Sequence, residues 1–115
     1  MAKPKIPDPL TRRHLIEGAL DPAKARAIAE AYLEAERAQE AVAFLARAEA
    51  PDALEALWQQ AVRGGDPFLL REVSVALSRA PDAATWEQLG AAADAAGKDR
   101  YAAEARRQVA RLAGA

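Results

Sequence analysis

Five dipeptides that join an aspartate to a proline divide this chain of 115 residues into short helical segments. An aspartate just before a helix accepts hydrogen bonds from the first free amides, and proline is tolerated in the first turn because no amide donor is needed there. Glycine, by contrast, often follows the last residue of a helix. The dipeptides are Asp8-Pro9, Asp21-Pro22, Pro51-Asp52, Asp66-Pro67 and Pro81-Asp82, and the glycines that mark helix ends are Gly18, Gly64, Gly65 and Gly97.

These boundary signals predict seven helices and no strand. The weakest boundary lies near Arg37, because residues 22–49 contain no glycine or proline and have the local propensity to form one long helix. The repeat spacing given below divides that stretch. The predicted helices cover residues 9–18, 22–36, 38–49, 52–63, 67–79, 83–96 and 99–113.

The composition agrees with an all-α fold. Alanine supplies more than a quarter of the residues, and it both favours helix and lets helices approach closely because it is small. The length allows one modest core, so we expect a single helical domain over residues 9–115. A flexible arm over residues 1–8, which carries Lys3 and Lys5, is expected to precede it.

The charge pattern and the absence of cysteine exclude several kinds of partner and site. Acidic and basic residues are interspersed and sum to a net charge of −1, which provides no broad field for nucleic acid or an anionic membrane. Without cysteine, the chain has neither disulfides nor thiolate metal ligands. No segment has the pattern of a signal peptide or of a membrane span, so we expect a soluble cytoplasmic protein.

Residue types suited to catalysis are few and scattered. His14 is the only histidine and stands beside two arginines, with no second candidate metal ligand or catalytic partner in a recognisable motif. No serine or threonine lies in a recognisable nucleophile motif, and Gly64-Gly65 is not followed by the lysine of a phosphate-binding loop. The chain also lacks an HExxH motif and a calcium-loop spacing. We therefore expect no enzyme activity and no metal or other cofactor.

Apolar spacing predicts where the core lies. The segment 67–79 is apolar on more than one side, so we expect it to form the most buried helix. This places Phe68, Leu69, Leu70, Val73, Val75 and Leu77 in the core, which Tyr32, Phe44, Leu45, Trp86, Val109 and Leu112 extend toward both ends.

Small and aromatic residues recur at a spacing typical of helical repeats. Trp86, Leu89 and Gly90 form a WxxLG pattern that resembles the first helix of a tetratricopeptide repeat, and Ala93, Gly97 and Ala102 occupy further positions of that template. A second match to the same template lies nearer the N-terminus and consists of Ile28, Ala29, Tyr32, Ala41, Leu45 and Ala48. Residues 53–79 fit less well, because Trp58 stands where a small residue is expected, and they instead resemble a HEAT repeat.

Either resemblance implies an α-α superhelix, a right-handed stack of about three helical hairpins after an N-terminal helix. A compact helical bundle with similar pairwise packing is the alternative. Repeat stacks bind a peptide or a partner helix in a concave groove lined by the first helix of each hairpin. The groove residues that the resemblance implies are Arg26, Glu30, Leu33, Glu34, Glu55, Gln59, Arg63, Glu87, Ala91 and Asp94. The set leans acidic, which favours a basic or apolar partner segment.

Two other functions are alternatives to such a protein-interaction module, and the sequence leaves the oligomeric state open. The first is a nucleic-acid-binding accessory that uses basic ends of the chain. Its residues are Lys98, Arg100, Arg106, Arg107 and Arg111 at one end, which otherwise form the polar outer face of a terminal repeat, and Arg12, Arg13 and His14 at the other. The second is a structural homo-oligomer in which an exposed Trp58 anchors the interface between copies.

Overall fold

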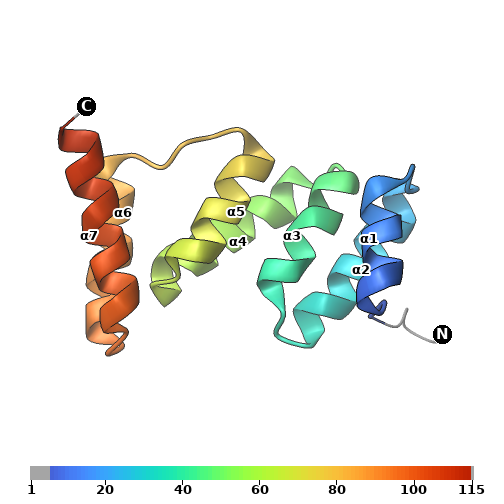
Figure 1. Cartoon of the computed structure of the whole chain (residues 1–115), viewed down its shortest axis with the longest axis horizontal. Coiled ribbons are helices and arrows are strands. Elements are labelled where there is room, and N and C mark those ends of the chain that lie inside the picture. The colour runs from blue at the N-terminus through green and yellow to red at the C-terminus, as the bar shows by residue number, and fades with distance from the viewer. Residues whose placement is uncertain (1–5, 115) are drawn as a thin grey trace. The chain divides into compact units, whose positions relative to one another are not determined.

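The computed structural model describes residues 6–114, and over that range it contains seven α-helices and no strand (Figure 1). The fold is therefore all-α, as the sequence predicts. Every predicted helix is present, with ends within two residues of the predicted ones. Residues 1–5 of the predicted N-terminal arm lie outside the described residues. The helices are α1 (Pro9–Glu17), α2 (Pro22–Glu34), α3 (Ala38–Arg47), α4 (Pro51–Gly64), α5 (Pro67–Leu77), α6 (Ala83–Ala95) and α7 (Asp99–Ala113).

Aspartate side chains cap four of these helices, as predicted from the aspartate-proline pairs. Asp8, Asp21, Asp66 and Asp82 accept hydrogen bonds of 2.8–3.1 Å from amides in the first turns of α1, α2, α5 and α6. The fifth pair behaves differently, because α4 begins at Pro51 and Asp52 already lies inside the first turn. A carboxylate there still interacts favourably with the positive end of the helix dipole.

Five helix ends share one geometry, in which a residue with positive φ follows the helix. The next amide donates to the carbonyl oxygen five residues back, which satisfies a free carbonyl of the last turn. Gly65 and Gly97 adopt this conformation at φ of 68° and 72°. Glu36, Glu49 and Ser78 adopt it without glycine, at φ of 59°, 52° and 53°. The turn at Glu36 therefore divides residues 22–49 into α2 and α3, as the repeat spacing predicts.

Contacts divide the chain into two units, one ending at Leu54 and one beginning at Glu55, so that α4 spans the boundary. Each unit contains a helical hairpin, α2 with α3 in the first and α6 with α7 in the second (Figure 1). The single domain expected over residues 9–115 stays a prediction.

In the first unit, α2 and α3 pack around two stacked aromatic rings. The ring centroids of Tyr32 and Phe44 lie 5.6 Å apart with an interplanar angle of 22°, and both side chains are fully buried. Burial of such side chains contributes roughly 1.5–3 kcal/mol each. The surrounding core consists of Ala25, Ile28, Ala29, Ala41, Val42 and Leu45.

The first helix, α1, is held to this hairpin by an arginine stacked on the same rings. No residue of α1 is fully buried. The guanidinium carbon of Arg12 lies 5.7 Å from the Tyr32 ring centre and 5.5 Å from that of Phe44. Its Nη2 also donates to the carbonyl oxygen of Glu40 on α3 at 3.0 Å. Arg12 is therefore half-buried and engaged in packing, so it contributes less to the basic patch of the nucleic-acid alternative than the sequence suggests.

A second arginine holds the other end of α1. Arg47 on α3 donates to the carbonyl oxygen of Gly18 at 3.1 Å and to that of Ile16. These carbonyls lie at the C-terminal end of α1, where backbone oxygens lack partners within the helix and positive charge is favoured. Two arginines, Arg12 and Arg47, thus connect α1 to the hairpin of α2 and α3.

In the second unit, α6 and α7 contact each other at small residues. A Cβ atom built on Gly90 would lie 3.3 Å from the Cβ of Ala105. Trp86, Leu89, Ala93 and Ala102 are buried around this contact. Larger residues at these positions would force the two helices apart.

The fifth helix, α5, is buried on one face only. Leu69, Leu70 and Val73 are buried, whereas Phe68 is 40% exposed and Val75 is 75% exposed. The prediction that Phe68 and Val75 lie in the core is therefore wrong. Part of the apolar surface of α5 therefore remains exposed to solvent.

Gly65→Ala is expected to destabilise the protein, because residue 65 combines a positive φ with a close approach. The positive φ alone costs an L-residue roughly 1–2 kcal/mol, and the added Cβ would lie 2.6 Å from backbone atoms of Ala93 on α6. We expect a loss of about 2 kcal/mol or more in the free energy of unfolding, measured by urea denaturation. Gly64→Ala is the matched control, since nothing lies within 4 Å of its added Cβ. Equal losses in the two variants would contradict the packing of Gly65 on α6.

Tyr32→Phe is expected to leave the stability unchanged or to raise it. The Tyr32 hydroxyl is buried with no hydrogen-bond partner among residues 6–114, so its removal relieves an uncompensated desolvation cost. Tyr32→Ala, which removes the stacked ring, should lose about 3–5 kcal/mol in free energy of unfolding, measured by urea denaturation. A loss above about 1 kcal/mol in Tyr32→Phe would show that the hydroxyl is hydrogen-bonded in solution.

Candidate functional site

A groove with an apolar floor runs between α6 and α7 on one side of their hairpin. Its volume is about 400 Å³. The lining consists of Trp86, Glu87, Gly90, Ala91 and Asp94 from α6 and Arg106, Val109 and Ala110 from α7. Three of the residues expected in a binding groove, Glu87, Ala91 and Asp94, therefore lie together at one hollow.

The groove exists because small residues occupy its floor. Gly90 brings α7 close to α6, and its neighbour Ala91 together with Ala110 leaves space that longer side chains would fill. Trp86 is 3% exposed and forms a rigid wall. The hollow is thus set by the packing of the hairpin itself.

Charged side chains stand at the edges of the groove. Nη1 of Arg106 lies 3.4 Å from Oδ2 of Asp94, with 63% and 56% of the two side chains exposed. An ion pair this exposed contributes little to stability, because water screens it. Glu87 is exposed on the α6 edge and has no ion-pair partner among residues 6–114. The α6 edge is therefore acidic.

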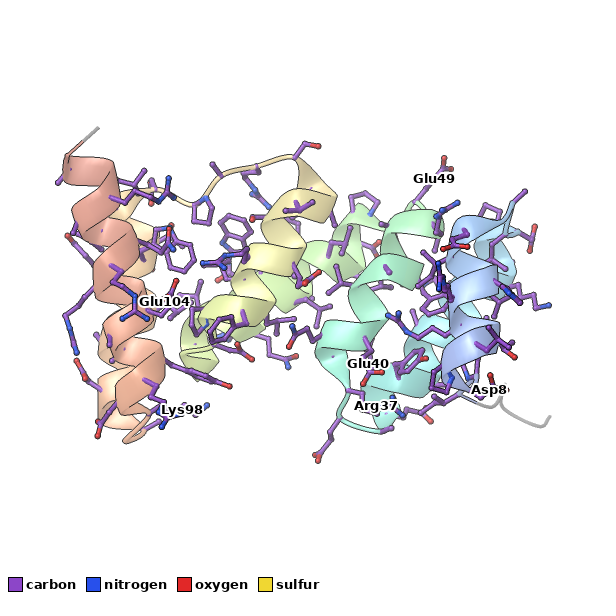
Figure 2. All side chains as sticks on the ribbon, in the orientation of Figure 1. Asp8, Arg37, Glu40, Glu49, Lys98 and Glu104 are labelled. Atoms are coloured by element: carbon purple, nitrogen blue, oxygen red, sulfur yellow. The ribbon has the colours of Figure 1, made fainter. Side chains whose placement is uncertain are left out.

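The other side of the same hairpin is covered by α5. Nη2 of Arg71 lies 2.9 Å from Oε1 of Glu104, and the rings of Phe68 and Tyr101 meet edge to face at 5.5 Å. Figure 2 shows Glu104 on α7. Glu104 and Arg106 are two positions apart, or about 200° around the helix, so the side covered by α5 and the groove lie on opposite faces of α7.

The binding residues expected on α2 lie on its surface. Glu30 and Glu34 are exposed, and Leu33 is half-buried. Arg26 lies 3.6 Å from Glu30 and 3.5 Å from Asp52 in the first turn of α4. The hydrogen bond from Arg26 holds the pKa of the Asp52 carboxyl below its ordinary value. Arg26 therefore connects two helices within the first unit.

The binding residues expected on α4 are partly engaged in packing. Glu55 forms an ion pair with Arg79, whose guanidinium lies 4.3 Å from the centre of the Trp58 ring. Trp58 is only 8% exposed, so the prediction of an exposed Trp58 is wrong and the argument for an interface between copies fails. Gln59 and Arg63 are exposed, and Arg63 donates from Nε to the Gln59 carbonyl oxygen at 3.4 Å.

The arginines of α7 are largely engaged with acidic or amide groups. Arg107 donates to Glu104 at 2.9 Å, Arg111 donates to Gln108 at 2.8 Å, and Arg106 reaches the carboxylate at the groove edge. The carboxylates of Glu104 and Asp94 offset part of the positive charge that α7 presents. They do not favour a stripe for nucleic-acid phosphates.

A second hollow, of about 570 Å³, lies at the turn between α6 and α7. Its lining consists of Gly97, Lys98, Asp99, Arg100 and Tyr101. Nζ of Lys98, labelled in Figure 2, donates to the carbonyl oxygen of Gly64 at the end of α4 at 2.8 Å. This lysine therefore has a structural role.

Potential metal ligands do not gather in the part of the chain that the structure describes. No group of three or more histidine, cysteine, aspartate or glutamate side chains in residues 6–114 is placed to hold a metal ion. His14 is exposed on α1. Within the same residues, no helix combines the length and apolarity needed to cross a membrane.

Comparisons with known proteins add no relative. No family model, no curated protein and no solved structure matches this chain.

The sequence predicts partner-binding residues on the α6 edge of the groove but none on its α7 wall. It predicts Trp86 and Gly90 as packing residues, and Arg106 as part of a polar outer face. The α7 wall could have been predicted from the spacing of Arg106, Val109 and Ala110, which places them on one face of a helix. That face adjoins the buried positions Ala102 and Ala105, of which Ala105 lies against Gly90 of α6.

Acid is expected to destabilise the protein through carboxylates whose pKa is lowered by folding. Hydrogen bonds from Gln108 and Arg107 hold the pKa of Glu104 below its ordinary value, and Arg37, beside Glu40 in Figure 2, does the same for Glu40. A lowered pKa stabilises the folded state fully above the unfolded value of about 4.3. That contribution is lost as pH falls through the folded pKa. Urea denaturation should therefore show a free energy of unfolding that falls below about pH 4.5.

Glu104→Gln tests the source of this acid dependence. Glu104 is only 14% exposed and bonds Arg71 and Arg107, so the variant should lose roughly 1 kcal/mol at pH 7 and show a smaller further loss at pH 3. Glu72→Gln, at an exposed position of α5, is the control and should match the wild type at both pH values. An unaltered acid dependence in Glu104→Gln would show that the network around Glu104 does not form in solution.

Proposed function

We propose that this chain is a non-catalytic protein-protein interaction module that binds a peptide or a partner helix in the groove between α6 and α7. The observation that carries the proposal is that Glu87 and Asp94, two of the residues expected to bind a partner, border a hollow with an apolar floor. Binding sites typically combine such an apolar floor with a few charged groups that fix orientation.

The packing of the hairpin supports this function. The groove walls belong to two helices in close contact at Gly90 and Ala105, so little of the site has to become ordered when a ligand binds. The exposed faces of α2 and α4, with Glu30, Glu34 and Gln59, are proposed as further contact surfaces.

The same packing supports the proposed relation to tetratricopeptide-like or HEAT-like hairpins. The resemblance expects small residues where two helices of a hairpin meet, and Gly90 and Ala105 meet in this way. We propose the cytoplasm as the compartment, because a chain without cysteine needs no oxidising environment to fold. Nucleic-acid binding is the less favoured function, since Arg106, Arg107 and Arg111 of α7 already bond neighbouring side chains.

A selection from a displayed library of helical peptides tests the proposal. The folded chain is the bait, and enriched peptides are then titrated against two variants. Ala91→Phe fills the groove, whereas Gln88→Phe adds the same side chain at an exposed position of α6 that does not line it. We expect peptides that bind the wild type and Gln88→Phe with similar affinity and lose at least about tenfold with Ala91→Phe.

Circular dichroism and thermal unfolding verify that both variants fold. Failure to enrich any peptide, or enriched peptides that bind Ala91→Phe as well as Gln88→Phe, would reject the groove as the binding site.

A further inference from the structure

We infer that the groove between α6 and α7 takes a basic amphipathic helix of a partner protein, laid along α6 with a lysine or arginine over Glu87. This inference rests on the proposed function and names the class of partner. It follows from three observations on the second unit: the two faces of the hairpin, the size of the groove floor and the charge of the α6 edge.

The first observation is that, within the second unit, α5 packs on one face of the hairpin. On that face, α5 lies against α7, where Arg71 pairs with Glu104 and Phe68 meets Tyr101. The opposite face carries the groove. Two packed antiparallel helices present such a furrow on each face, and a third helix can lie in either one.

The second observation is the size of the groove floor. The lining of α6 runs from Trp86 to Asp94, a rise of about 12 Å along the helix. A straight partner helix would therefore contact the floor over about two turns. Because Gly90, Ala91 and Ala110 are small, that helix can approach closely with Leu-sized side chains in the hollow.

The third observation is the charge of the α6 edge. Glu87 and Asp94 are seven positions apart, so they lie on one side of α6 about 10 Å from each other. Arg106 offsets Asp94 on the α7 side, which leaves Glu87 as the carboxylate without an ion-pair partner among the described residues. A cationic side chain on the partner complements that carboxylate, and a carboxylate would be repelled.

A second copy of this chain is a poorer occupant than a partner helix. In a twofold dimer each copy would offer the same surface to the other. Two hollow faces cannot fill each other, whereas the convex surface of one helix fits the furrow.

Two synthetic amphipathic peptides provide the test. Both have 14 residues and the same stripe of leucine and alanine, and the flanking positions are lysine in one and glutamate in the other. Binding is measured by calorimetry and by the fluorescence of Trp86 in a Trp58→Phe background, where Trp86 is the remaining tryptophan. The full chain is used throughout.

Charge reversal at one position separates a specific contact from general attraction. Glu87→Lys changes the groove edge, and Glu72→Lys makes the same change of net charge on the exposed face of α5. We expect the lysine peptide to bind the wild type, to lose about tenfold or more in affinity with Glu87→Lys, and to bind Glu72→Lys with at most a small loss. Circular dichroism verifies that each variant folds.

Other results would overturn the inference in distinguishable ways. Equal binding of the glutamate peptide would reject a basic partner and leave the groove function standing. Equal losses in Glu87→Lys and Glu72→Lys would show non-specific attraction. A dimer of the free chain that dissociates in Ala91→Phe would make a second copy the occupant. If neither peptide binds at millimolar concentration, the basic-helix inference fails, and the library selection alone decides the proposed function.

Discussion

Close contact between small residues is the constraint on which the second unit depends. Gly90 lies against Ala105 within the hairpin, and Gly65 lies against the backbone at Ala93. A Cβ at residue 65 would clash with that backbone, and one at residue 90 would require Ala105 to shift, so both contacts limit the separation of the helices. The groove is a consequence of the same small side chains, because Ala91 and Ala110 leave its floor unfilled. Stability and the proposed binding site thus have one origin.

Arginines connect the helices where the apolar core is thin. Arg12 stacks on Tyr32 and Phe44 from α1, and Arg79 covers Trp58 from the end of α5. Arg47 donates to backbone carbonyls at the end of α1. These side chains combine a flat cation that lies over aromatic rings with several donors. Arginine side chains, which the sequence suggests for recognition, therefore partly serve to pack the helices together.

The helices were largely predictable because their signals are local. Asp8, Asp21, Asp66 and Asp82 act as caps within three residues of their own positions, so sequence alone locates the starts of these helices. The candidate site was predictable only in part. Its α6 edge followed from a family resemblance, whereas Arg106, Val109 and Ala110 became lining residues only through the approach of a second helix.

The sequence by itself determined the seven helices found in residues 6–114, because capping, helix propensity and the positions of proline and glycine act over a few residues. The tertiary structure decided which apolar side chains are covered. Trp58 is buried under Arg79, which follows α5, while Val75 in the most apolar segment is exposed. Burial depends on neighbours that come from distant parts of the chain, and periodicity within one helix carries no information about them.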